Sequence, residues 1–196
     1  MNKPNGYDEA KATGEFIPVE LGGHHATIKQ VSEKTSSTGK PMIVILFDFD
    51  QTDKQPDYFS KQFAGDDRAD KKWPFAGSKY ILVNDYQDAT KTSKDFKTFC
   101  TCAEKSNGFQ ISWGGSNWGA QFKGKRIGVV YGEEEQEYDG KTSMRRVPKW
   151  FCEYQNAESS QIPRPKYLKK AGTAIQTDSQ GFMALPNAVE EEEIPF

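Results

Sequence analysis

Alternation of apolar and polar residues predicts a β-hairpin in the first third of the chain. Residues 24–31 alternate between the two faces of an extended strand. Residues 42–49 are apolar on both faces, which is typical of a strand covered on both sides. A polar loop rich in turn-forming residues, 32–40, lies between them, so the two strands are expected to form a long hairpin. Residues 58–63 are expected to form a third, shorter strand.

Helical periodicity follows in the middle of the chain, at residues 93–107. Ser93 is the expected N-cap, with Asp95 in the first turn, and Asn107-Gly108 supplies the stop. One face of this helix is apolar and is expected to pack on the core through Phe96, Phe99, Cys100 and Ala103.

A second hairpin is predicted from residues 125–138 and 141–154. Asp139-Gly140 joins them, because Asp-Gly tolerates the positive φ of a two-residue type I′ turn. Such a turn also fixes the register of the paired strands. The side expected to face the core then pairs Val129 with Trp150, Ile127 with Cys152 and Tyr131 with Pro148.

The other face of this second hairpin is the candidate surface for a nucleic acid. Lys and Arg neutralise phosphates, and aromatic rings stack on bases of any sequence. Pro148 lacks an N–H and indicates a bulge, which would move Lys149 and Trp150 to opposite faces, so Trp150 is the reserve stacking residue. The residues predicted to bind a single strand are Lys34 and Lys40 beside the first loop, and Tyr138, Lys141, Arg145, Lys149 and Phe151 on the second hairpin.

Strands in two hairpins with one helix between them are typical of a mainly β OB-fold, a small, partly open Greek-key barrel. Another small α+β fold or an SH3-like barrel gives the same periodicity, so these alternatives stay open. The predicted organisation is a flexible N-terminal arm at 1–19, an OB-fold domain at 20–157, a disordered linker at 158–189 and an acidic tip at 190–196.

Composition adds a division of charge along the chain. The total net charge is −2, but residues 171–196 contain five acidic residues and no basic ones, which leaves +3 for residues 1–170. A mildly basic body with an acidic tail suits a protein whose tail contacts its own anion-binding surface.

Several classes of protein are not expected from this sequence. No apolar run approaches the roughly 20 residues that cross a bilayer, and residues 1–14 lack a signal-peptide core, so no membrane partner and a cytoplasmic location are predicted. Cys100, Cys102 and Cys152 are expected to be reduced thiols without zinc-site spacing. With no phosphate-binding loop, dinucleotide motif or nucleophile elbow, neither a cofactor, a metal nor an enzymatic activity is expected.

The last seven residues form an acidic run followed by an apolar tip. The carboxylates repel one another in water, and Pro195 disfavours helix at Ile194. Phe196 offers a ring and a carboxylate together, which suits an apolar pocket with a basic rim, whereas the alternative is a merely solubilising tail. The predicted partner-binding residues are Glu190, Glu191, Glu192, Glu193, Ile194, Pro195 and Phe196.

This tip resembles that of bacterial single-stranded-DNA-binding proteins, with Glu where that family usually has Asp. The resemblance implies that the tip recruits replication and repair proteins and competes with DNA for the protein's own basic groove. The bacterial proteins' tetramer is not implied, because the body differs from theirs and the tether is short.

The body, over about residues 20–155, resembles phage-encoded single-stranded-DNA-binding proteins of Gram-positive hosts. The matching stretches are Lys34-Thr35, 39–42, 123–135, 138–141, Arg145, Val147 and Trp150-Phe151. This resemblance implies an OB-fold that coats single-stranded DNA during replication or recombination in the cytoplasm of a bacterial host. A homodimer stays possible. The alternatives are a protein-interaction adaptor, an RNA- or duplex-binding barrel, and a strand-annealing recombination accessory protein.

Overall fold

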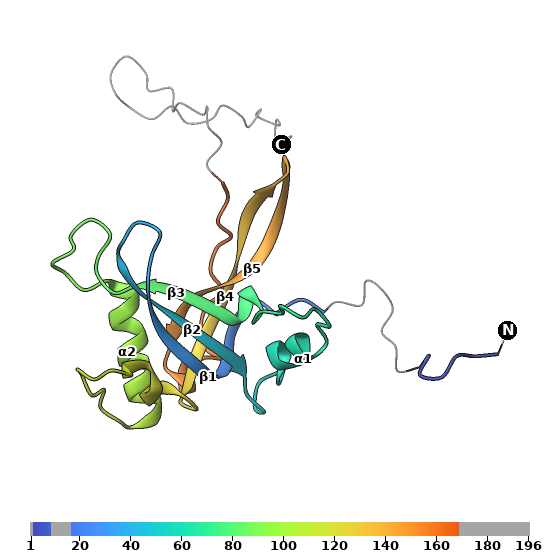
Figure 1. Ribbon diagram of the computed structural model, residues 1–196, viewed down its shortest axis with the longest axis horizontal. Helices are drawn as coiled ribbons and strands as arrows, with labels where there is room; N and C mark the ends of the chain where they lie inside the picture. The colour runs from blue at the N-terminus through green and yellow to red at the C-terminus, as the bar shows by residue number, and fades with distance from the viewer. Residues whose placement is uncertain (1, 9–16, 169–196) are drawn as a thin grey trace, which may run out of the picture.

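A curled antiparallel sheet organises residues 2–8 and 17–168, which are the residues that the computed structural model describes (Figure 1). The protein is mainly β, with five strands in the order β3-β2-β1-β4-β5. The strands are β1 Gly22–Thr35, β2 Pro41–Phe49, β3 Ser78–Leu82, β4 Arg126–Tyr138 and β5 Lys141–Cys152. The helices are α1 Tyr58–Ala64 and α2 Lys94–Asn107, with short 3₁₀ turns η1 Phe75–Gly77, η2 Trp118–Phe122 and η3 Tyr154–Asn156.

Strand β1 joins the two halves of the sheet because it has two partners. Residues 22–27 pair with β4, whereas residues 26–35 pair with β2. A bulge at Lys29, just past the end of the pairing with β4, bends the strand. The two edge strands approach each other: Nζ of Lys79 on β3 donates to the carbonyl oxygens of Pro148 and Lys149 on β5, at 3.2 and 2.7 Å. The sheet is therefore curled almost to closure.

The core lies inside this curled sheet and is rich in aromatic rings. Alternation along β2 turns Ile43, Ile45, Phe47 and Phe49 inward, as the two-faced apolar pattern allows. Each α-helix adds inward rings, Phe59 from α1 and those of the α2 face. The largest fully buried side chains include Phe47, Phe49, Phe59, Phe99, Phe122 and Tyr131.

Helix α2 confirms the prediction for residues 93–107. Oγ of Ser93 accepts a hydrogen bond from the N–H of Phe96 at 3.1 Å, and Gly108, with φ of 61°, ends the helix in the left-handed conformation. The four residues of the predicted apolar face are all buried: Phe96, Phe99, Cys100 and Ala103.

Residues 58–63 form a helix, so the predicted third strand is wrong. The N-terminus of α1 is capped from a distant strand: Oδ1 of Asp48 on β2 accepts from the N–H of Phe59 at 2.9 Å, and Oδ2 accepts from that of Ser60 at 3.1 Å. The local N-cap, Asp57, makes no side-chain cap. A cap supplied by tertiary structure leaves no local sequence signal, which is why periodicity missed it.

Both predicted hairpins form, but the register of the second changes partway along. Asp139 and Gly140 have φ of 51° and 70°, as a type I′ turn requires, and the predicted pairing of Tyr131 with Pro148 is present. Beyond it, a bulge leaves Lys149 unmatched. The predicted pairs of Trp150 and Cys152 are therefore wrong: Val130 faces Trp150, Val129 faces Phe151 and Gly128 faces Cys152.

The C-terminal described segment differs from the predicted linker. Lys166 bridges β4, donating to the carbonyl of Glu133 at 3.0 Å and accepting from the N–H of Glu135 at 2.8 Å. Ala157 is buried, and a Cβ on Gly23 would lie 1.7 Å from its oxygen, so this segment packs closely on β1. Within the predicted linker, Lys166 is thus hydrogen-bonded to β4. The rest of the predicted linker and the predicted tip lie outside the described residues.

Strand β3 was not predicted, and β1 continues four residues past its predicted end at Val31, to Thr35. Five-residue strands between irregular segments give little periodic signal. Within residues 2–8 and 17–168, no helix is long and apolar enough to cross a bilayer.

Candidate nucleic-acid interface

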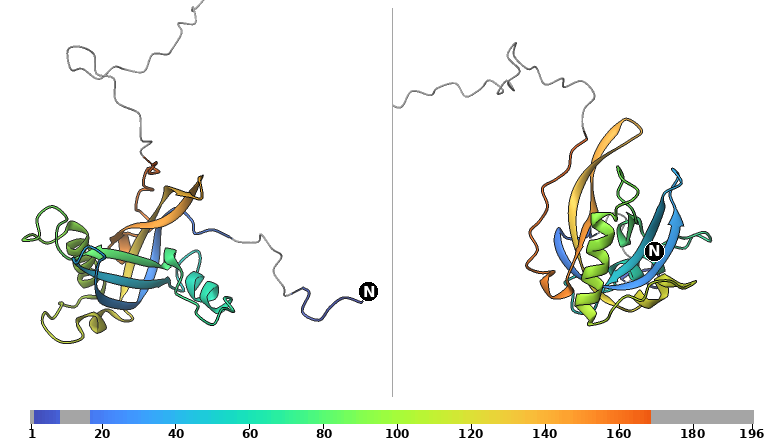
Figure 2. Two further views of the ribbon diagram at one scale, coloured as in Figure 1. Left: turned by 45° about the horizontal axis from the view of Figure 1, so that its top comes forward. Right: turned by 90° about the vertical axis from the view of Figure 1, so that its left-hand side faces the viewer.

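The distal parts of β4 and β5, residues 132–147, project beyond the rest of the sheet as an arm (Figure 2). Cross-strand pairing puts Tyr138, Lys141 and Arg145 on one face of this arm, as predicted. Tyr138 and Lys141 flank the turn, and Tyr138 is 83 % exposed. The tip of the arm therefore presents a ring and an ammonium group to solvent.

Nearer the body, acidic residues of β4 engage the cations of the arm. Nζ of Lys149 lies 2.9 Å from Oε1 of Glu134, and Nη2 of Arg145 lies 3.8 Å from Oε2 of the same carboxylate. The hydrogen bond from Lys149 holds the pKa of Glu134 below its ordinary value. On the reverse face Arg146 lies 3.8 Å from Glu133. Lys149 is therefore already paired with a carboxylate of the protein, which makes it a weaker candidate for contact with a DNA phosphate than an unpaired lysine.

Phe151 is a correction to the predicted DNA-binding set. The bulge at Lys149 turns its ring inward, where it is 2 % exposed. The ring contacts those of Phe47 and Phe99, with centroids 5.8 and 5.3 Å away. A ring packed in the core cannot stack on a base, whereas the reserve residue Trp150 is exposed.

The two predicted lysines lie at the two sides of the first loop: Lys34 near the C-terminal end of β1, and Lys40 just before β2. Lys34 is exposed. Nζ of Lys40 lies 3.9 Å from the ring centroid of Tyr86 and donates to the carbonyl of Tyr86 at 2.7 Å. The structure therefore adds an exposed ring, Tyr86, to the lysine predicted from sequence.

An exposed aromatic pair on the outer side of the sheet was missed by sequence reasoning. Tyr80 on β3 is 53 % exposed and stacks on Phe75 of η1, with centroids 6.3 Å apart. The guanidinium of Arg145 lies 5.1 Å from the Phe75 centroid, and its Nε is buried without a hydrogen-bond partner among the described residues. The stretch 78–82, Ser-Lys-Tyr-Ile-Leu, does not alternate, so no periodic signal in the sequence could have found Tyr80.

A cavity of about 580 Å³ continues from this pair to the foot of the arm. It lies between α1, η1 and the arm. Its lining residues include Tyr58, Phe75, Glu133, Met144, Arg145 and Arg146.

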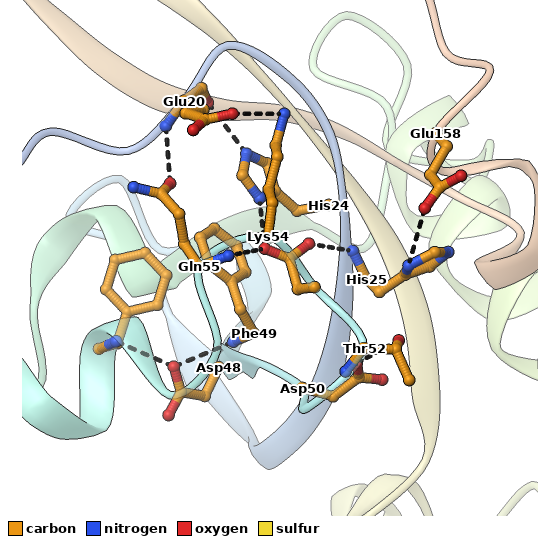
Figure 3. Close-up of polar contacts among 12 residues, drawn as sticks. Glu20, His24, His25, Asp48, Phe49, Asp50, Thr52, Lys54, Gln55 and Glu158 are labelled. Atoms are coloured by element: carbon orange, nitrogen blue, oxygen red, sulfur yellow. Dashed lines mark hydrogen bonds and ion pairs between the residues drawn. The ribbon is translucent and has the colours of Figure 1, made fainter.

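A second polar cluster lies around the loop after β2 and is structural in character (Figure 3). Nδ1 of His24 lies 3.0 Å from Oδ1 of Asp53, and its Nε2 lies 3.0 Å from the carbonyl oxygen of Glu20. The ring is buried and stacks on Phe49 at 4.1 Å. Asp53 also accepts from the N–H of His25 at 2.8 Å. This network ties the start of β1 to the loop.

Neither thiol chemistry nor a metal centre is indicated in the described part of the chain. Burial raises the pKa of Cys100 to about 12 and that of Cys102 to about 11, which keeps both protonated and unreactive near neutral pH. No group of three or more His, Cys, Asp or Glu side chains within residues 2–8 and 17–168 is placed to hold a metal ion.

No protein-family model matches the sequence, and no curated protein matches it.

Proposed function

We propose that this protein binds single-stranded DNA without sequence preference, through an OB-fold. The sheet order places β1 between β2 and β4, with α2 between β3 and β4 in the chain and with β3 close to β5. OB-folds bind oligonucleotides on the face of their second and third strands and through the loops that join strands 1–2 and 4–5. In this chain those elements carry Tyr80, the lysines of the first loop and the tip of the arm.

One observation carries the proposal: the exposed stack of Phe75 and Tyr80 with Arg145 against it. Bases unpaired from a partner strand can stack on such rings, and each stack contributes about 1–3 kcal/mol regardless of sequence. A duplex withholds its bases from this interaction. Exposed Lys34, near the end of β1, and exposed Lys141, at the start of β5, flank the two loops where phosphates of the bound strand would pass.

The proposed role is coating of single strands in replication or recombination, without turnover. We further propose that the C-terminal tip docks replication or recombination proteins, on the strength of its sequence alone. The adaptor and strand-annealing alternatives differ measurably: an adaptor shows no salt-dependent DNA binding, and an annealing protein accelerates the pairing of complementary strands.

The decisive experiment is a fluorescence titration with oligo-dT and with a duplex of equal length, at two salt concentrations. We expect preferential binding of oligo-dT, quenching of Trp or Tyr emission, and weaker binding as salt rises. Tyr80→Ala should weaken binding by about 5- to 100-fold, and Tyr80→Phe should retain most of it.

Tyr7→Ala is the matched control, because Tyr7 is exposed but belongs to the N-terminal segment away from the sheet. Equal affinity for duplex and single strand would reject the proposal. Equal affinity of Tyr80→Ala and wild type would retain single-strand binding but move it to another surface.

A further inference from the structure

Three aromatic rings stack beside α2. Trp113 stacks on Trp118, with centroids 5.6 Å apart and planes 24° apart, and Trp118 stacks on Phe96 of α2 at 5.7 Å and 28°. Phe96 is buried in the core, whereas the outermost ring, Trp113, is 64 % exposed. A large apolar ring held in solvent by two rings beneath it is a more informative surface feature than an isolated exposed side chain.

The loop that carries Trp113 is held in place by side-chain and backbone contacts. Gln121 accepts from the N–H of Ser112 at 2.9 Å and donates to the carbonyls of Ser112 and Trp118 at 3.1 and 2.9 Å. Gly119 lies against β1 so closely that a Cβ there would be 2.1 Å from the oxygen of Val31. The Trp113 ring is therefore presented by a fixed loop, which lowers the entropic cost of stacking on it.

A polar groove of about 490 Å³ separates this loop from β1. Lys29 and Lys123 line it together with Gln30, Ser32, Ser116 and Asn117, whereas Glu33 is the one acidic residue among its lining residues. Nζ of Lys29 also lies 4.0 Å from Oδ2 of Asp48, which makes Lys123 the main candidate for a phosphate contact. An ammonium group beside hydroxyl and amide groups suits a phosphate-bearing backbone better than an apolar peptide.

One row of cross-strand pairs joins the groove to the proposed binding face. Ser32 on β1 pairs with Val44 on β2, and Val44 pairs with Tyr80 on β3. Side chains of paired residues share a face of the sheet, so this row leads from the Tyr80 ring across two strands to the groove. A strand lying on Tyr80 can thus cross the sheet and reach Trp113.

We infer that the Trp113 stack and the adjoining groove form a second contact surface for the same single strand of nucleic acid. A base stacks on the open face of Trp113, and the backbone passes Lys29 and Lys123. This inference rests on the proposed function and extends its footprint beyond the elements that OB-folds ordinarily use.

The test compares Trp113→Leu with Trp113→Phe in titrations of oligo-dT of increasing length. Leu keeps an apolar side chain without a π-system, and Phe keeps the ring, so stacking predicts a loss of about 5- to 100-fold for Leu and a smaller loss for Phe. The oligonucleotide length at which affinity stops rising should also shorten in Trp113→Leu. Circular dichroism and thermal melting confirm that both variants fold.

Lys123→Gln provides an independent readout, because it keeps a polar side chain at this position but removes one charge. We expect its log-affinity against log-salt slope to fall by about 0.7, the value for one phosphate contact on a single strand. Wild-type affinity, slope and length dependence in both Trp113→Leu and Lys123→Gln would overturn the inference while leaving the proposed function intact. Failure of the wild-type protein to bind oligo-dT would instead overturn the proposed function.

Discussion

At the scale of single residues, β5 contains cations of two kinds that the sequence does not distinguish. Lys141 is exposed at the turn, whereas Lys149 is half-buried and paired with Glu134 at 2.9 Å. We predict that replacing Lys141 affects DNA binding and that replacing Lys149 affects stability. Lys141→Met should reduce the salt slope of DNA binding by about 0.7 and leave unfolding unchanged, whereas Lys149→Met should lower the free energy of unfolding by about 1–2 kcal/mol.

The pH dependence of the second effect follows from Glu134. The pKa of Glu134 is lowered in the folded protein. The stabilisation by its ion pair with Lys149 is therefore fully present at pH values above the ordinary pKa of a glutamate. It is lost as the pH falls through the lower pKa that Glu134 has in the folded protein. Urea denaturation at pH 7 and under acid conditions should therefore show a difference between wild type and Lys149→Met that shrinks in acid. A difference independent of pH would mean that packing of the lysine stem, and not the ion pair, stabilises the arm.

At the scale of elements, α1 shows how a helix can depend on a side chain from another element. Asp48, which is buried on β2, accepts hydrogen bonds from two N-terminal N–H groups of α1. Asp48→Ala should lower the free energy of unfolding by about 2 kcal/mol, since it removes a cap and leaves buried donors without acceptors.

The matched control for this element is Asp57→Asn. Asp57 is the local N-cap with φ of 56°, a conformation that Asn tolerates, and its side chain makes no cap. We expect this variant to unfold like wild type in urea. Equal destabilisation by both variants would show that Asp48 does not cap the helix.

At the scale of the whole molecule, the division of charge predicts self-competition for the DNA surface. The described chain approaches the arm at its end, where the N–H of Leu168 donates to Oε2 of Glu135 at 3.0 Å. An acidic segment tethered from this point has a high effective concentration at the basic surface. Deleting residues 190–196 should therefore raise affinity for oligo-dT several-fold at low salt, and less at high salt.

Phe196→Ala separates this electrostatic effect from partner docking. It removes a ring and no charge, so DNA affinity should stay within about twofold of wild type while capture of replication or recombination proteins is lost. Retained capture by Phe196→Ala, together with unchanged DNA affinity after the deletion, would show that the tail only improves solubility.

The sequence by itself determined the elements whose signals are local. Helix α2 carries its own cap and stop, the second hairpin carries its own turn, and the apolar run 42–49 can only be a strand inside the sheet.

Tertiary structure decided the rest. Asp48 capped α1 from a distance, Glu134 on β4 paired with Lys149, and the bulge that Pro148 had indicated in the sequence sent Phe151 into the core. The candidate stacking surface also arose this way, because Phe75, Tyr80 and Arg145 meet only when the sheet curls and brings β3 to β5. Such contacts join residues far apart in the chain, so no periodicity or local motif records them.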